Sequence, residues 1–193
     1  MQFAVGRLAC VNWSLKVDSD LLVVKCSYQR HGERILEIFN HAILTSTALY
    51  DYAPRDLQQI EAWFSNKSIG RWPILGLESS NGELCAFGSF GPFRNFPAYK
   101  YTVEHSVYVA EEFRGQGLGR TILQLLIDRA QQDNYHALIG AIDANNSVSC
   151  GLHEKLGFEL VGTLPQVGFK FGEWLDLALY QLTLKTPHKP VDG

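Results

Sequence analysis

Apolar residues in this chain recur with two periods, one typical of helices and one typical of strands. Three segments place them three and four residues apart, which predicts helices with one buried face. These apolar stripes are Ile35, Ile38, Phe39, Ala42 and Ile43; Leu57, Ile60 and Phe64; and Leu118, Ile122, Leu125 and Leu126. Pro54 stands where the second helix can begin, because the N–H that proline lacks has no partner in a first turn. A short fourth helix is expected after Asn146 or Ser147, either of which can cap it, and Gly157 would end it.

Short apolar runs between these segments predict strands. They are residues 21–26, 74–78, 84–90, 102–110, 137–142, 158–164 and 174–184. Asn81-Gly82, between the second and third runs, is a strong β-hairpin signal. The resulting order is strand, two helices, three strands, helix, strand, helix and two strands. It predicts a mixed α/β domain in which a helix crosses the sheet between two parallel strands.

Length, charge and cysteine usage bound the organisation of the protein. The 193 residues suit one domain, expected at 21–185, with an N-terminal extension at 1–20 and a loose polar C-terminal tail at 186–193. The net charge of −3 gives no support to nucleic acid as a partner, and no apolar run is long enough to span a membrane. We read no secretory signal at the N-terminus. The four dispersed cysteines favour reduced thiols in the cytoplasm, and neither they nor the six histidines have the spacing of a metal site.

The segment between the fourth strand and the third helix carries the candidate chemistry. It reads Arg114-Gly-Gln-Gly-Leu-Gly-Arg120. The first amides of a helix lack intrahelical partners and lie at the positive end of its dipole, and glycines let a phosphate approach the backbone. A nucleotide P-loop would need Gly-Lys-Ser/Thr, and a dinucleotide fingerprint would need Gly-x-Gly-x-x-Gly near the first strand; neither is present. A different phosphate-bearing ligand is therefore predicted, and the alternative is a plain glycine-rich turn.

This loop fits the pattern Arg/Gln-x-x-Gly-x-Gly/Ala and resembles the pyrophosphate loop of the GNAT superfamily of acetyltransferases. Other segments resemble its phosphinothricin acetyltransferase-like branch, which includes enzymes acting on methionine sulfoximine and methionine sulfone. They are residues 38–40, 46–48, 63–64, 102–109, 152–158 and 168–176. The resemblance covers roughly residues 21 to 184. It implies the GNAT fold, acetyl-CoA as co-substrate, no metal and a homodimer, with strands 102–110 and 137–142 splayed around the pantetheine arm.

Two residues are candidates for proton transfer. By resemblance, Glu104 is the general base, and apolar neighbours would raise the pKa of its carboxyl toward a useful range. The alternative is a surface glutamate paired with Lys100 or Arg94. His153 stands where many GNAT enzymes carry a tyrosine that protonates the leaving thiolate. It could transfer a proton near neutral pH, or only bond nearby backbone.

The resemblance also implies binding residues. For the cofactor they are Val107, Tyr108 and Val109 through their backbone, and Arg114, Gly115, Gln116, Gly117, Leu118, Gly119, Arg120, Asn146 and Ser149. For the substrate they are Arg94, Asn95, Phe96, Glu104, His105 and Ser106. An arginine suits a carboxylate or phosphinate because its fork makes two parallel bonds. Helix capping by Asn146, an exposed helix position for Arg120 and simple packing of the loop aromatics remain alternatives.

The expected reaction is transfer of the acetyl group of acetyl-CoA to the α-amino group of a small amino-acid-like molecule such as phosphinothricin, methionine sulfoximine or methionine sulfone. Holding both substrates together would lower the barrier without a covalent enzyme intermediate. Two alternatives stay open: an acceptor that is a protein N-terminus or a polyamine, and a non-catalytic acyl-CoA sensor. We see no acidic cluster around residues 91–101 that would favour a polyamine.

Overall fold

The computed structural model describes residues 21–192, so the expected N-terminal extension at 1–20 lies outside the described residues. The strands are β1 (Leu21–Lys25), β2 (Ile74–Ser79), β3 (Leu84–Pro92), β4 (Thr102–Val109), β5 (Ala137–Asp143), β6 (Glu159–Lys170) and β7 (Glu173–Thr183). The helices are α1 (Tyr28–Thr45), α2 (Leu57–Ile69), α3 (Leu118–Gln132) and α4 (Ser147–Lys155), with short 3₁₀ turns at Pro97–Tyr99 and Glu111–Phe113. The predicted α/β order is confirmed.

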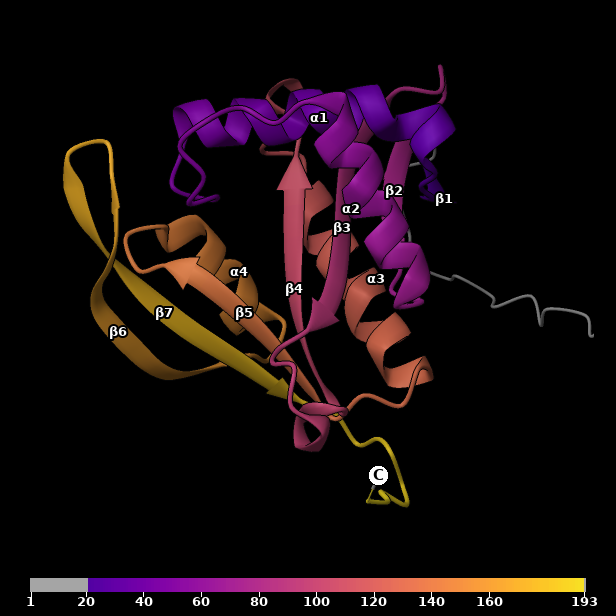
Figure 1. Ribbon diagram of the computed structural model, residues 1–193, viewed down its shortest axis with the longest axis vertical. Coiled ribbons are helices and arrows are strands. Elements are labelled where there is room, and N and C mark those ends of the chain that lie inside the picture. Colours follow the sequence, from indigo (N-terminus) through magenta and orange to yellow (C-terminus); the bar gives the residue numbers. More distant parts are fainter. Residues whose placement is uncertain (1–20, 193) are drawn as a thin grey trace, which may run out of the picture.

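The strands form one mixed sheet in the order β1-β2-β3-β4-β5-β7-β6. Every neighbouring pair is antiparallel except β4 and β5, which are parallel and connected through α3. In Figure 1, α1 and α2 cover one face of the β2–β4 region and α3 covers the other. The sheet thus divides into a part built around β1–β4 and a part built around β5–β7, and the two parts meet only at the lower ends of β4 and β5.

Two apolar clusters fix the helices to opposite faces of the sheet. The α1/α2 cluster contains Phe39, Phe87 and Tyr108, whose rings lie 4.9–5.3 Å apart between centroids. The α3 cluster contains Ile122 and Leu126, both fully buried. The helices α1 and α3 bury their predicted stripes, because residues three and four apart share one helical face. In α2 only Ile60 and Phe64 of the predicted stripe are buried, whereas Leu57, in the first turn, is 41% exposed.

The predicted start of the second helix is wrong. The second helix begins at Leu57 rather than at Pro54, because Asp56 and Gln59 form a reciprocal capping box that satisfies the first free amides. The first helix begins at Tyr28, about two turns before Ile35, the first residue of its apolar stripe. There the Nδ1 atom of His31 accepts the Ser27 N–H at 3.0 Å and replaces a side-chain cap.

The residues after β7 are fastened to the domain, so the expectation of a loose tail is wrong for them. Thr186 is buried; its hydroxyl donates to the Tyr135 carbonyl at 2.5 Å, and its carbonyl accepts from His136 Nδ1 at 2.9 Å. The Val191 N–H donates to the Tyr101 hydroxyl at 3.2 Å. The polar composition of this segment reflects hydrogen bonds to the turn before β5, which a local sequence pattern does not reveal.

Candidate active site

The candidate site is a gap between β4 and β5. The two strands pair over only three positions, from Thr102 opposite Ala137 to Glu104 opposite Ile139. Beyond them β4 stays with β3 while β5 stays with β7, so the strands separate. The separation opens a cavity of about 1110 Å³ that α1, α4 and the loop before α3 also border.

Most of the predicted site residues line this cavity. They are Glu104, His105, Ser106, Val107, Tyr108, Val109, Arg114, Gly115, Gly117, Leu118, Gly119, Arg120, Asn146, Ser149 and His153. They come from β4, from the glycine-rich loop with the start of α3, and from α4 with its cap, and the fold brings these three parts of the chain around one space. Their predicted individual roles remain proposals.

The glycine-rich loop forms an open cradle at one end of the cavity. Gly115 and Gly117 adopt φ angles of +76° and +81°, which side chains disfavour, and a Cβ atom at either would meet nothing within 4 Å. The Arg114 N–H bonds the Glu111 carbonyl, and the Thr121 N–H bonds that of Gly117. Among the described residues, the amides between these two have no acceptor. The cradle therefore offers unpaired amides and nearby arginines, and it fits a diphosphate.

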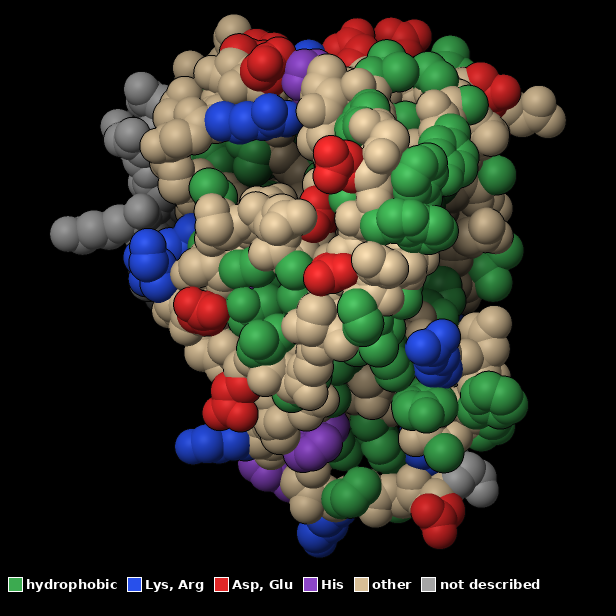
Figure 2. Space-filling model, turned by 90° about the vertical axis from the view of Figure 1, so that its left-hand side faces the viewer, with side chains coloured by type: hydrophobic (Ala, Val, Ile, Leu, Met, Phe, Trp, Pro, Cys, Tyr) green, Lys and Arg blue, Asp and Glu red, His purple; other side chains and the backbone are tan. Residues whose placement is uncertain are grey.

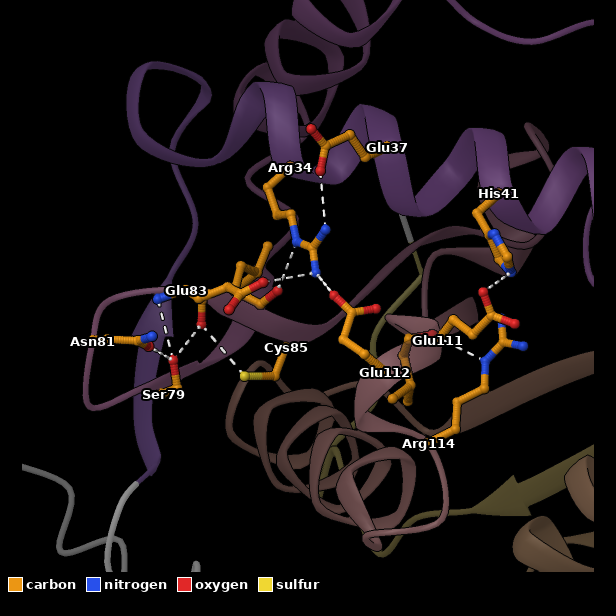
Figure 3. Close-up of polar contacts among 12 residues, drawn as sticks. Arg34, Glu37, His41, Ser79, Asn81, Glu83, Cys85, Glu111, Glu112 and Arg114 are labelled. Carbon is orange, nitrogen blue, oxygen red and sulfur yellow. Dashed lines mark hydrogen bonds and ion pairs between the residues drawn. The ribbon is translucent and has the colours of Figure 1, made fainter.

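Ion pairs to α1 hold the turn that precedes this cradle (Figure 3). Arg34 contacts Glu112 and also lies 3.1 Å from a Glu83 oxygen and 3.0 Å from a Glu37 oxygen. His41 lies 3.4 Å from Glu111. Since these partners come from α1, from the turn between β2 and β3, and from the turn at 111–113 itself, they tie the entrance of the cradle to the rest of the domain.

The backbone of β4 points polar groups into the gap. Ala110 N–H donates to the Cys85 carbonyl of the preceding hairpin strand, and backbone groups alternate in direction along a strand. The N–H and C=O groups of Val107 and Val109 therefore face the side that β5 has left. Those of Tyr108 face β3, opposite Phe87, so Tyr108 borders the cavity through its ring.

Glu104 lies at the closed end of the gap, on the last position where β4 and β5 pair. Partial burial raises the pKa of its carboxyl, and the positive charge of Arg94 opposes that shift. None of the hydrogen bonds among residues 21–192 uses its carboxylate. A carboxylate that is free of partners, open to the cavity and more basic than usual can accept a proton from a bound amine.

Four predicted residues do not line the cavity. The side chain of Gln116 turns back to the Glu112 carbonyl at 3.5 Å. Arg94, Asn95 and Phe96 lie in the exposed segment after β3, where the Arg94 guanidinium sits 5.0 Å from the Phe93 ring centroid. Only Arg94 is linked to the site, through its electrostatic effect on Glu104.

A clasp that the sequence does not predict closes the other side of the cavity. The segment Ser46–Tyr50, between α1 and α2, lines the cavity and is held by Lys170 at the end of β6. The buried Lys170 ammonium donates to the Ser46 carbonyl at 2.9 Å and to the Leu49 carbonyl at 2.5 Å. Thr47 donates to Asp143 at the end of β5. The stretch 168–176 was recognised as characteristic of one branch, but the partner of its lysine lies more than 120 residues away.

The comparisons with known proteins agree with this geometry. Residues 35–158 match the family described as "Acetyltransferase (GNAT) family". The chain therefore belongs to the GNAT family of acetyltransferases.

Within the family, the relatives point to one branch. A Pseudomonas aeruginosa L-methionine sulfoximine/L-methionine sulfone acetyltransferase is 45% identical over 150 residues, which is 78% of this chain and 87% of the relative. The structure of yncA from Salmonella typhimurium, with its cofactor acetyl-CoA, is 38% identical with a TM-score of 0.85 and covers 90% of this chain and 99% of its own. A Sinorhizobium meliloti phosphinothricin acetyltransferase in complex with AcCoA is 30% identical, also with a TM-score of 0.85, covering 90% and 95%.

Two further properties concern membranes and metals. Within residues 21–192, no helix has both the length and the apolar character needed to cross a membrane. The same residues contain no group of three or more histidine, cysteine, aspartate or glutamate side chains arranged to hold a metal ion.

We predict that Lys170→Met lowers the free energy of unfolding by about 1–3 kcal/mol, because two buried carbonyls lose their donor. Chemical denaturation measures the change. Lys185→Met, at an exposed lysine outside the clasp, is the matched control and should stay within about 0.5 kcal/mol. Equal stability of the two variants would show that the clasp contributes nothing.

Proposed function

We propose that this protein transfers the acetyl group of acetyl-CoA to the α-amino group of a small amino-acid-like molecule, such as methionine sulfoximine, methionine sulfone or phosphinothricin. The observation that carries the proposal is a partner-free Glu104 at the closed end of a gap whose other end is a diphosphate cradle. The relatives named above act on these acceptors or were solved with acetyl-CoA. Their similarity supports the same donor and the same class of acceptor here.

Each end of the gap has a separate task in this proposal. The amides of the cradle, with Arg114 and Arg120, bind the diphosphate of coenzyme A. The backbone of Val107 and Val109 binds the amides of its extended arm, and Asn146 and Ser149 border the same arm. When bound, acetyl-CoA supplies an activated thioester. The N–H groups of β4 that face the gap can donate to the oxygen on which charge develops during transfer.

Glu104 would accept the proton that the substrate ammonium must lose before its nitrogen becomes nucleophilic. Its raised pKa makes it a stronger base than an ordinary glutamate. Because both substrates occupy one enclosed space, no covalent enzyme intermediate is needed. Arg94, with Asn95 and Phe96, is the proposed contact for the carboxylate or phosphinate of the acceptor, supported by the effect of Arg94 on Glu104.

We predict that Glu104→Gln lowers kcat by about 10²–10⁴-fold while leaving the affinity for coenzyme A unchanged, since the variant loses only the proton acceptor. Release of free thiol from acetyl-CoA measures turnover with methionine sulfoximine, methionine sulfone, phosphinothricin, spermidine and short peptides. In the wild type, activity should rise with pH through the raised pKa of Glu104, and this limb should vanish in the variant.

Glu61→Gln, at an exposed position on α2, is the matched control and should retain full activity. Unchanged kcat in Glu104→Gln would refute the base assignment. If only spermidine or the peptides are acetylated, the acceptor is a polyamine or a protein N-terminus instead of a small amino-acid-like molecule. If the protein binds the cofactor but acetylates none of the acceptors, it is a non-catalytic acyl-CoA sensor.

A second copy of the chain is the proposed partner. β6 is the edge strand of the sheet, and its outer side has no strand neighbour among the described residues. Exposed apolar side chains gather on the β6–β7 hairpin, on the side turned toward the viewer in Figure 2. They are Leu160, Val161, Leu164, Val167, Phe169, Phe171 and Trp174. An apolar edge of this kind favours burial against another protein surface.

We predict that the 21.7 kDa chain sediments as a dimer and that Phe171→Ser combined with Trp174→Ser shifts it toward the monomer. Sedimentation velocity at micromolar concentration measures both. Val191→Ser changes an exposed apolar residue outside the hairpin and should leave the dimer intact. A monomeric wild type would refute the homodimer.

The proposed compartment is the cytoplasm. Cys26, Cys85 and Cys150, the cysteines among the described residues, are all free, as expected in a reducing environment.

A further inference from the structure

Two buried histidines meet where β4 and β5 separate. His105 is the first residue of β4 beyond the last pair with β5, and His153 lies on α4. Their rings are stacked, with centroids 5.1 Å apart and planes inclined by 16°, and the two Nε2 atoms are 3.2 Å apart. Both rings border the cavity but are only 8% and 4% exposed. They therefore occupy the wedge from which the gap opens.

The hydrogen bonds of the pair determine which nitrogens carry protons. The Nδ1 atom of His153 lies 2.7 Å from the Ser149 carbonyl, which can only accept, so this nitrogen carries a proton. A single proton then lies between the two Nε2 atoms. If His153 held it, His153 would be a buried cation, and His105 would carry its own proton on Nδ1. That nitrogen is buried and has no partner among residues 21–192.

The reverse assignment avoids both the buried positive charge on His153 and the unpaired N–H on His105. With the proton on Nε2 of His105, that ring donates to the Nε2 lone pair of His153, and both rings are neutral. The Nδ1 atom of His105 is then a bare lone pair, which is less costly to bury than an unpaired N–H. Protonation is thus assigned from the hydrogen-bond network.

The surroundings also favour neutral rings. Phe158 packs against His105 and His153 with centroids 5.5 Å and 5.0 Å away, and a Cβ atom on Gly140 of β5 would lie 3.0–3.1 Å from both rings. Burial and the neighbouring ring lower the pKa of His105 to about 3, and burial lowers that of His153.

The titratable groups nearest the pair are engaged elsewhere. On β7, Tyr180 lies 5.9 Å from His153 between ring centroids, but its hydroxyl donates to Glu154 of α4. Cys150 of α4 raises the pKa of the Tyr180 hydroxyl. Glu104 lies on the face of β4 opposite to that of His105. No carboxylate from α4, β4, β5 or β7 among the described residues bonds either imidazole.

We propose that His105 is a positioning residue. Its Nε2–H donates a hydrogen bond to the Nε2 lone pair of His153, and this bond holds both rings as one neutral unit. His153 then has both nitrogens occupied and is not a free acid or base in the resting protein. The proposal rests on the proposed function in one respect: it leaves Glu104 as the proton acceptor of the acetyl transfer. Of the two interpretations of His153 in the sequence, the geometry thus favours the one in which it only makes internal hydrogen bonds.

The test is the protonation pattern of the two rings in the full-length protein labelled with ¹⁵N-histidine. Long-range ¹H–¹⁵N correlation spectra distinguish protonated from bare ring nitrogens. We expect a proton on Nδ1 of His153 and on Nε2 of His105, a nitrogen–nitrogen coupling across the Nε2 pair, and two uncharged rings at neutral pH.

Two variants separate positioning from mere packing. His105→Phe keeps a ring but removes the donor, so the coupling should be lost and the His153 Nε2 resonance should shift to that of an unbonded nitrogen. His105→Gln, whose amide can donate, should move the resonance back. A proton on His153 Nε2 in the wild type at neutral pH, or a His153 Nε2 resonance that does not respond to His105→Phe, would overturn the proposal.

The wild-type spectrum alone shows which ring nitrogens of His105 and His153 carry protons, even if a variant does not fold. Because it involves no turnover, its failure leaves the transferase proposal intact. Conversely, a protein with this spectrum that releases no thiol with any acceptor would refute the transferase and keep the histidine pair.

Discussion

The site depends on one constraint, which is that β4 and β5 pair over three positions and then part. Each strand has a complete antiparallel neighbour on its other side, β3 for β4 and β7 for β5, so both remain well ordered as they diverge. The wedge at the point of divergence is filled by the two histidine rings, and Gly140 is small enough to leave them room. An extended ligand can then complete the edge of β4 in place of the missing strand.

The charges around this gap are divided by function. Arginines and unpaired amides gather at the cradle, where a diphosphate would bring negative charge. At the opposite end, burial shifts the pKa values of two kinds of group in opposite directions: it raises that of Glu104 and lowers those of His105 and His153. Near neutral pH the two histidines stay uncharged, and the Glu104 carboxylate is the group that can accept a proton. Such divergent shifts often separate the acid–base group of a site from its supporting residues.

The sequence predicts the parts of this structure that depend on local patterns. The apolar stripes predict the helices, and the arginine and glycines at 114–120 predict the cradle, because strand, turn and helix start are encoded within one short stretch. Side chains alternate between the two faces along β4, so Tyr108 lies on one face and Val107 and Val109 lie on the other. Tyr108 packs with the α1/α2 cluster, whereas Val107 and Val109 pack with the α3 cluster.

What the sequence does not reveal depends on contacts between distant residues. The Lys170 clasp joins residues more than 120 positions apart, and the histidine pair joins residues 48 apart. The fastened tail meets a turn some 50 residues earlier in the chain. No period or motif records such pairings, since each is a consequence of how the sheet is assembled. The start of α2 is a local failure, because the capping box at Asp56 outweighs the proline signal at Pro54.

In the proposed complex, the edge of β4 that the departure of β5 exposes binds the extended arm of coenzyme A. Amide hydrogen exchange, measured residue by residue with and without coenzyme A, tests it most directly. We expect the Val107 and Val109 amides and those of residues 115–120 to exchange more slowly when coenzyme A is bound. The Tyr108 amide, which already faces β3, should change much less. Tight binding of coenzyme A that leaves the Val107 and Val109 amides unprotected would contradict it.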